Sequence, residues 1–167
     1  MLEINNYNSS ILHEISFSLK ENENLIILGE NGAGKSTLAK VLSNLISNDK
    51  VELLGENISK ISDLKRTQLI NYIPPKLSIF DEYVTLREFL ELSFIENVNN
   101  QKIDEVIKLL NLKKLEDKYC KSFSSGEKQL LLLASAIMHN AQITIFDELT
   151  ANLDISRLKE VFEIFNS

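Results

Sequence analysis

Apolar and polar residues in the first third of the chain form short runs that predict strands around one helix. Residues 2–4 and 12–19 alternate between apolar and polar, which is typical of half-buried strands. Residues 25–28 are apolar without alternation, which predicts a strand buried on both faces. In residues 35–46 the apolar positions, Leu45 among them, recur at helical spacing. The pattern therefore predicts a strand, a glycine-rich loop and a helix in succession.

The rest of the chain alternates between strand and helix patterns, which predicts an α/β fold. Residues 51–54 and 70–73 are strand-like, and Pro74-Pro75 turns the chain after the second of them. A helical pattern fills most of the segment from about 76 to 123, which predicts an all-helical insertion. Residues 127–139 form a strongly helical run, residues 143–146 a buried strand, and residues 155–165 a last helix.

Length, charge and composition exclude several classes of function. A chain of 167 residues fits a single domain, here residues 1–167. The net charge of −6 argues against a broad nucleic-acid-binding surface, so no nucleic-acid partner is expected. One cysteine cannot form an internal disulfide, which fits a reducing compartment. Since no apolar run reaches the ~18–20 residues of a membrane span, contact with a membrane is expected only through a partner.

A glycine-rich loop after residues 25–28 carries the strongest chemical signal. The segment matches G-x-x-x-x-G-K-[ST], in which backbone N–H groups surround phosphate oxygens at the start of a helix. Lys35 adds a positive charge at the β- and γ-phosphates, and the hydroxyl of Ser36 can ligate Mg²⁺. The alternative is an ordinary glycine-rich turn. The residues expected to contact a nucleotide are Gly29, Asn31, Gly32, Ala33, Gly34, Lys35, Ser36 and Thr37.

Two carboxylates follow the strand predicted at residues 143–146. In a parallel sheet the carboxyl ends of the strands face the ligand crevice. Asp147 is therefore expected to hold Mg²⁺, and Glu148 to act as the general base toward an attacking water. The alternative is an acidic turn in which Asp147 caps the next helix.

Together these motifs resemble the nucleotide-binding domain of ATP-binding cassette (ABC) proteins over essentially the whole chain. The loop GENGAGKST is similar to the family's Walker A motif, and ITIFDE to its Walker B motif with the catalytic glutamate. FSSGE at residues 123–127 resembles the signature LSGGQ, and Tyr7 stands where the family has an aromatic that stacks on adenine. The resemblance implies a P-loop NTPase fold with an ABC-type core sheet, and ATP and Mg²⁺ as ligands.

The resemblance also implies a head-to-tail homodimer in the ATP-bound state. Ser124 and Gly126 of one subunit would then contact the γ-phosphate bound to the other, although Ser124 can equally cap the helix that follows it. The helical insertion would contact integral membrane permease subunits at the inner face of the cell membrane. Its alternative role is a hairpin that only covers the core.

Three departures from the family pattern affect these expectations. Pro75 stands where the family has a glutamine that contacts Mg²⁺, and Glu127 replaces the glutamine of the signature. The charge of Glu127 is unfavourable beside phosphate unless its side chain points away. The chain also ends at Ser167, before the family's histidine that senses the γ-phosphate, so the C-terminal part of the usual domain is expected to be absent.

The function expected from these observations is the ATPase subunit of an ABC transporter, of the iron-chelate or cobalamin importer type. It would couple ATP binding, dimerisation and hydrolysis to transport by a permease. Two alternatives stay open: a nucleotide-binding module with weak or no hydrolysis, and a soluble ABC protein without a transport role.

Overall fold

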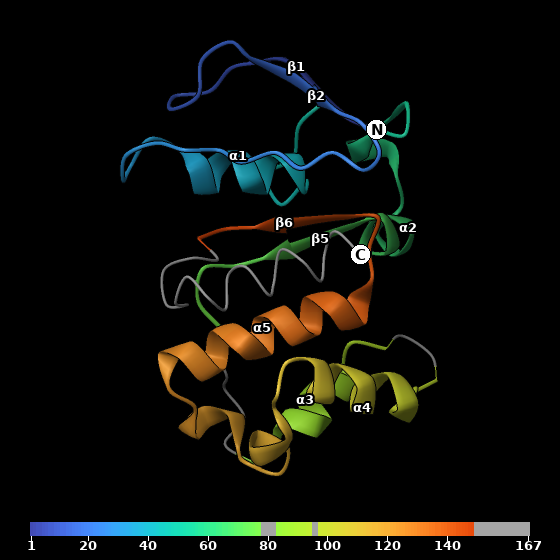
Figure 1. Cartoon of the computed structure of the whole chain (residues 1–167). Coiled ribbons are helices and arrows are strands. Elements are labelled where there is room, and N and C mark those ends of the chain that lie inside the picture. Colours follow the sequence, from blue (N-terminus) through green and yellow to red (C-terminus); the bar gives the residue numbers. More distant parts are fainter. Residues whose placement is uncertain (78–82, 95–96, 149–167) are drawn as a thin grey trace. The chain divides into compact units, whose positions relative to one another are not determined.

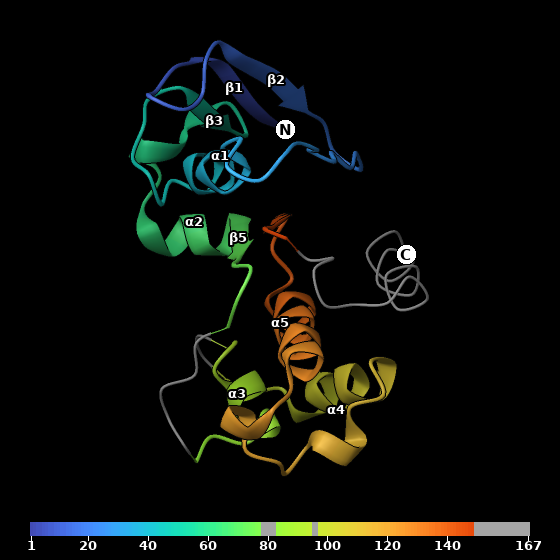
Figure 2. The same cartoon turned by 90° about the vertical axis from the view of Figure 1, so that its left-hand side faces the viewer.

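The computed structural model describes residues 1–77, 83–94 and 97–148, which form two compact units. The first unit comprises residues 1–72 and 141–147, and the second comprises residues 73–140 together with Glu148. Figure 1 and Figure 2 show the elements of both units, coloured along the sequence. The helix predicted at residues 155–165 lies outside the described residues.

A four-stranded antiparallel sheet forms one part of the first unit. Its strands are β1 (Leu2–Tyr7), β2 (Ile15–Leu19), β3 (Val51–Leu53) and β4 (Glu56–Asn57), in the order β2-β1-β3-β4. β1 pairs with β2 so that Leu2 faces Leu19 and Ile4 faces Phe17. Leu2 and Ile4 are buried in alternation, as expected of a sheet with one face on the core, and the register shifts before Tyr7, which is also buried.

The rest of the first unit contains two helices and a second sheet. Helix α1 (Lys35–Leu42) follows the glycine-rich loop, and a short 3₁₀ turn (Ile58–Lys60) precedes helix α2 (Asp63–Leu69). Strands β5 (Ile70–Ile73) and β6 (Ile143–Phe146) pair with each other and run in the same direction (Figure 1). Their carboxyl ends therefore lie at one edge of this sheet.

Two elements predicted from the sequence differ in the structure of this unit. Among the described residues, segment 25–28 joins neither sheet, and its side chains are exposed, Leu28 at 87%. The prediction of a buried strand there is wrong. An apolar run favours burial, but a strand also needs a neighbouring strand with which to pair. Helix α1 ends at Leu42 and Asn44 takes a left-handed φ of 58°, so Leu45 leaves the apolar face and is 62% exposed.

The second unit is helical, and each main helix begins with a side-chain cap. Helix α3 (Leu86–Glu91) starts at Thr85, α4 (Asn100–Leu109) at Asn99, and α5 (Ser125–His139) at Ser124. Helix α5 packs on α3 and α4 (Figure 2), and two 3₁₀ turns, η2 (Lys113–Leu115) and η3 (Cys120–Ser122), connect α4 to α5. The helical unit thus includes α5, whereas the sequence pattern predicts an insertion from about 76 to 123.

Apolar side chains from all three helices form the core of the second unit. The larger side chains of this core that are exposed by no more than 3% include Leu86, Leu90, Ile103, Val106, Ile107, Leu131 and Leu133. On α3 and α4 these residues have the i, i+3 and i+4 spacing that the helical pattern of the sequence predicts, whereas α5 is buried continuously from Gln129 to Ala134. No helix among the described residues has both the length and the apolar character needed to cross a membrane.

Candidate functional site

The glycine-rich loop takes backbone conformations that only glycine adopts without strain. Gly32 has a φ of 85° and Gly34 a φ of 93°, both in the left-handed region. At Gly34 an added Cβ would lie 2.8 Å from Leu12 Cδ2 and 2.9 Å from Ile11 Cγ2, so the loop packs closely on the segment after β1. The N–H of Leu38 donates to the Gly34 carbonyl at 2.8 Å, which begins helix α1 directly after the loop. The N-terminal N–H groups of α1 therefore border the loop and favour an anion there.

The side chain of Lys35 folds back onto the glycine-rich loop. Its ammonium donates to the carbonyls of Gly29 at 2.7 Å and Glu30 at 2.8 Å. An ammonium has three N–H donors, so one more can reach a phosphate oxygen. These contacts hold the ammonium of Lys35 at the glycine-rich loop, and its predicted contact with the β- and γ-phosphates stays a proposal.

Asp147 connects the loop to the acidic end of β6. The hydroxyl of Ser36 donates to Asp147 Oδ1 at 2.9 Å, joining positions 111 residues apart in the sequence. Asp147 is only 4% exposed. The structure therefore brings together the two residues that the sequence proposes as metal ligands.

Tyr72, which belongs to no motif of the sequence, completes this cluster. It lies on β5, and its hydroxyl donates to Asp147 Oδ2 at 3.0 Å. The pKa of Tyr72 is raised to about 12, mainly by burial and also by the hydrogen bond to Asp147 and the charge of that carboxylate. The phenol is therefore protonated at neutral pH and can donate. The alternation within β5 places Tyr72 on one face of the strand, but nothing in the sequence shows that its partner is 75 positions away.

The donor atoms at this site fit Mg²⁺. Ser36 and Asp147 offer a hydroxyl and a carboxylate, the oxygen ligands that this cation prefers. Within the described residues there is no group of three or more His, Cys, Asp or Glu side chains that could hold a metal. In proteins, Mg²⁺ is usually held by one or two carboxylates and keeps several water ligands.

Glu148 directly follows this cluster and is exposed. Its φ of 59° is left-handed, which is uncommon for a residue with a side chain and turns the backbone sharply after β6. Such strained positions occur often at functional sites. The predicted role of Glu148 as a general base remains a proposal.

The signature-like residues lie at the start of α5, in the second unit. The hydroxyl of Ser124 accepts from Glu127 N at 3.3 Å, and the Glu127 carboxylate accepts from Ser124 N at 2.7 Å. Lys118 forms an ion pair with the same carboxylate at 3.2 Å. The backbone hydrogen bond from Ser124, together with Lys118, lowers the pKa of Glu127. The helix is therefore capped within its own chain, and Gly126 lies in its first turn.

Two other residues named from the sequence lie in surroundings that limit their roles. Tyr7 is 9% exposed and belongs to the hydrophobic core of the first unit, so its ring does not offer a free face to adenine. Pro75 is half-buried after the end of β5. Since a proline ring has no donor or acceptor atom, it cannot contact a metal as the family's glutamine would.

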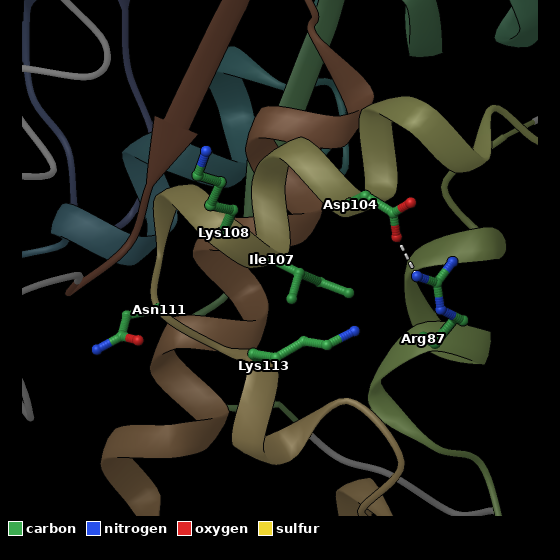
Figure 3. A pocket seen from close by; sticks show the side chains of 6 residues that line it. All are labelled: Arg87, Asp104, Ile107, Lys108, Asn111 and Lys113. Carbon is green, nitrogen blue, oxygen red and sulfur yellow. Dashed lines mark hydrogen bonds and ion pairs between the residues drawn. The ribbon is translucent and has the colours of Figure 1, made fainter.

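A hollow of about 500 Å³ lies within the helical unit, and Figure 3 shows its lining. Arg87 pairs with Asp104, and its Nε donates to Glu116 at 2.7 Å. Lys113 also pairs with Glu116, so two of the basic side chains are already matched by carboxylates. Hydrogen bonds from Lys113 and Arg87 lower the pKa of Glu116. This cluster connects α3, α4 and η2, which indicates a structural role. The residues that line the hollow are Arg87, Asp104, Ile107, Lys108, Asn111 and Lys113.

Solved structures similar to this chain are ATP-binding domains of ABC transporters. An ABC transporter ATP-binding protein from Pyrococcus furiosus has a TM-score of 0.83 at 24% identity, with 99% of this chain and 86% of that one covered. A dimeric ATP-binding cassette bound to ADP and phosphate has a TM-score of 0.79 at 19% identity, covering 99% and 81%. The predicted α/β fold of the P-loop NTPase class is thereby confirmed.

Sequence comparisons identify the family. Residues 12–151 match the family model described as ABC transporter. A Clostridium tetani protein named as an ABC transporter ATP-binding protein is 34% identical over 161 residues, which cover 94% of this chain and 37% of the relative. The zinc import ATP-binding protein ZnuC of Buchnera aphidicola is 32% identical over 165 residues, covering 98% and 64%. The chain thus spans less than two thirds of the length of these relatives. With its glycine-rich loop and acidic strand end, the chain belongs to the ABC transporter family.

Proposed function

We propose that this chain binds ATP with Mg²⁺ at the phosphate loop and hydrolyses it to drive transport. The observation that carries the proposal is the contact of 2.9 Å between Ser36 and Asp147. It joins the glycine-rich loop to the acidic end of β6, which supports a single site for the phosphates and the cation. Membership of the ABC transporter family supports ATP as the nucleotide.

Each side chain of the site has a distinct role in this proposal. The N–H groups of the loop and of the first turn of α1 bind the phosphate oxygens, and Lys35 orients the γ-phosphate through its remaining donor. Ser36 and Asp147 would hold Mg²⁺, which supplies neutralisation of charge on the phosphates when bound. Glu148 would accept a proton from the attacking water.

The proposal extends to a head-to-tail homodimer in which Ser124 and Gly126 face the nucleotide of the partner subunit. The start of α5 supports it, because a helix N-terminus with a serine hydroxyl suits an anion. A solved structure with the same fold is named as dimeric, which is consistent with such pairing.

We further propose that the chain acts at the cytoplasmic face of the cell membrane, bound to permease subunits. The names of relatives support transport in general, and one of them names zinc import. They do not confirm an iron-chelate or cobalamin cargo, so that narrower assignment stays a prediction. The absence of a nucleic-acid partner also stays a prediction.

One observation favours a second candidate function, a nucleotide-binding module that hydrolyses slowly. Pro75 cannot provide the contact that the family's glutamine makes with Mg²⁺, while the phosphate loop is intact. Both candidates bind ATP and differ only in turnover.

Phosphate release by the purified full chain separates the two candidates. We expect steady-state release to exceed that of Glu148→Gln by at least about tenfold, since general-base catalysis contributes roughly 10²–10⁴-fold. Lys35→Ala should abolish release, whereas Lys40→Ala removes an exposed charge from the same helix and should leave release unchanged. Release by the wild type no faster than by Glu148→Gln would favour the slow module.

A further inference from the structure

The Asp147 carboxylate is fixed on both of its oxygens by hydroxyl groups from different elements. Ser36, in the first turn of α1, donates to Oδ1 at 2.9 Å. Tyr72, on β5, donates to Oδ2 at 3.0 Å. Asp147 is 4% exposed, so water has little access to either oxygen. The orientation of this carboxylate therefore depends on two side chains, only one of which belongs to the phosphate loop.

We propose that Tyr72 is a positioning residue for the cation site, holding Asp147 so that Oδ1 faces Ser36 and the metal. This inference rests on the proposed function, because it assigns Tyr72 a part in metal binding at the same site. Tyr72 itself contacts neither the nucleotide nor the metal in this proposal. It acts on the metal only through the orientation of Asp147.

The effect of losing the phenol follows from the burial of Asp147. Without the phenol of Tyr72, Oδ2 would be a buried carboxylate oxygen that lacks this donor, which is unfavourable because burial removes the oxygen from water. The carboxylate would then turn toward another donor. This would move Oδ1 away from Ser36, so the two oxygens would no longer be placed to hold one cation. Groups that orient metal ligands typically change metal affinity by about 10–100-fold when removed.

The position of Tyr72 in the fold supports this role. β5 and β6 are neighbouring strands, and Tyr72 and Asp147 lie near the carboxyl ends of the two. A strand holds its side chains more rigidly than a loop does, and such rigidity suits a residue that orients a ligand. The interaction therefore links the sheet directly to the metal ligand.

The test measures the affinity of the full chain for Mn²⁺ in the presence of ATP. Electron paramagnetic resonance detects the free Mn²⁺. Tyr72→Phe removes only the hydroxyl, and Tyr72→His keeps a ring with an N–H donor. Tyr119→Phe is the matched control, because it removes a phenol from a half-exposed ring in the helical unit. Affinity for ATP in the presence of EDTA, and the urea midpoint of unfolding, are measured for every variant.

We expect Tyr72→Phe to bind Mn²⁺ about tenfold more weakly than the wild type, with metal-free ATP affinity changed by less than about twofold. Tyr72→His should recover part of the loss, and Tyr119→Phe should match the wild type.

Mn²⁺ affinity of Tyr72→Phe within about twofold of the wild type would overturn the role of Tyr72 while leaving the proposed function intact. An equal loss of metal-free ATP binding would also overturn it, because that pattern marks a general structural defect. If the wild type bound no ATP, the proposed function would fail and the role of Tyr72 with it.

Discussion

Gly34 offers a direct test of the phosphate loop, because its replacement by alanine introduces two separate penalties. A φ of 93° is left-handed and unfavourable for alanine by about 1–2 kcal/mol. The new Cβ would also lie 2.8 Å from Leu12 Cδ2, and Leu12 is only 5% exposed, so it has little room to move. Overpacking of this kind costs a further ~1–3 kcal/mol. We therefore expect Gly34→Ala to lower the free energy of unfolding by about 3 kcal/mol.

Two other glycines supply matched controls for this experiment. Gly32 and Gly55 have φ values of 85° and 80°, and an added Cβ at either would meet nothing within 4 Å. Gly32→Ala and Gly55→Ala should therefore each cost only the backbone penalty of about 1 kcal/mol. Gly55 lies in the turn between β3 and β4, so its replacement should leave nucleotide affinity unchanged. Gly32→Ala and Gly34→Ala, which both lie in the phosphate loop, should weaken nucleotide affinity.

Urea unfolding followed by circular dichroism measures the stability of the three variants, and calorimetric titration measures their affinity for ATP. The result that would refute the loop geometry is a Gly34→Ala protein as stable as Gly55→Ala. Unchanged affinity for ATP in both Gly32→Ala and Gly34→Ala would equally refute the role of this loop in binding phosphate.

Three further predictions concern the helical unit. Arg87→Gln should lower the free energy of unfolding by about 2 kcal/mol in urea, because Glu116 is buried and loses its guanidinium partner. Lys113→Gln should have a smaller effect, since Lys113 is exposed, and equal effects would contradict this assignment. The lowered pKa of Glu116 means that its stabilisation is present above the ordinary glutamate pKa of about 4.3 and is lost as the pH falls through its pKa in the folded state. The loss of stability on acidification should therefore be smaller in Glu116→Gln than in the wild type, and identical pH profiles would count against the ion pairs. Glu127→Gln should keep the helix cap, because glutamine also serves in a capping box, and should increase the ATP-dependent dimer seen by analytical ultracentrifugation in a Glu148→Gln background. A weaker dimer would argue against a γ-phosphate near the start of α5.

The sequence predicts the elements with strong periodicity well. β5 and β6 begin and end where the strands predicted at residues 70–73 and 143–146 do, and α5 extends the predicted helix by two residues at its start. The motif residues Lys35 and Ser36 begin α1, since the glycine-rich loop and helix are specified within one short segment. The local pattern locates these features, and β5 and β6 also form because each is the neighbour of the other.

The features that the sequence does not predict depend on partners far away in the chain. The strand predicted at residues 25–28 has the right composition, but strand formation also requires a neighbouring strand. Tyr7 lies at an aromatic position of the family pattern, yet its ring packs in the core of the first unit. Tyr72 has a role only because β5 and β6 pair, which a single sequence does not reveal.

The central claim is that the phosphate loop and the acidic strand end build one site for ATP and Mg²⁺. A double-mutant cycle on Ser36→Ala and Asp147→Asn, read out as ATP affinity in the presence of Mg²⁺, tests it directly. If both residues hold the same cation, each single variant should bind ATP about tenfold more weakly, and the double variant should lose little more than either. Unchanged affinity in the single variants, or losses that simply multiply to about a hundredfold in the double variant, would contradict the claim.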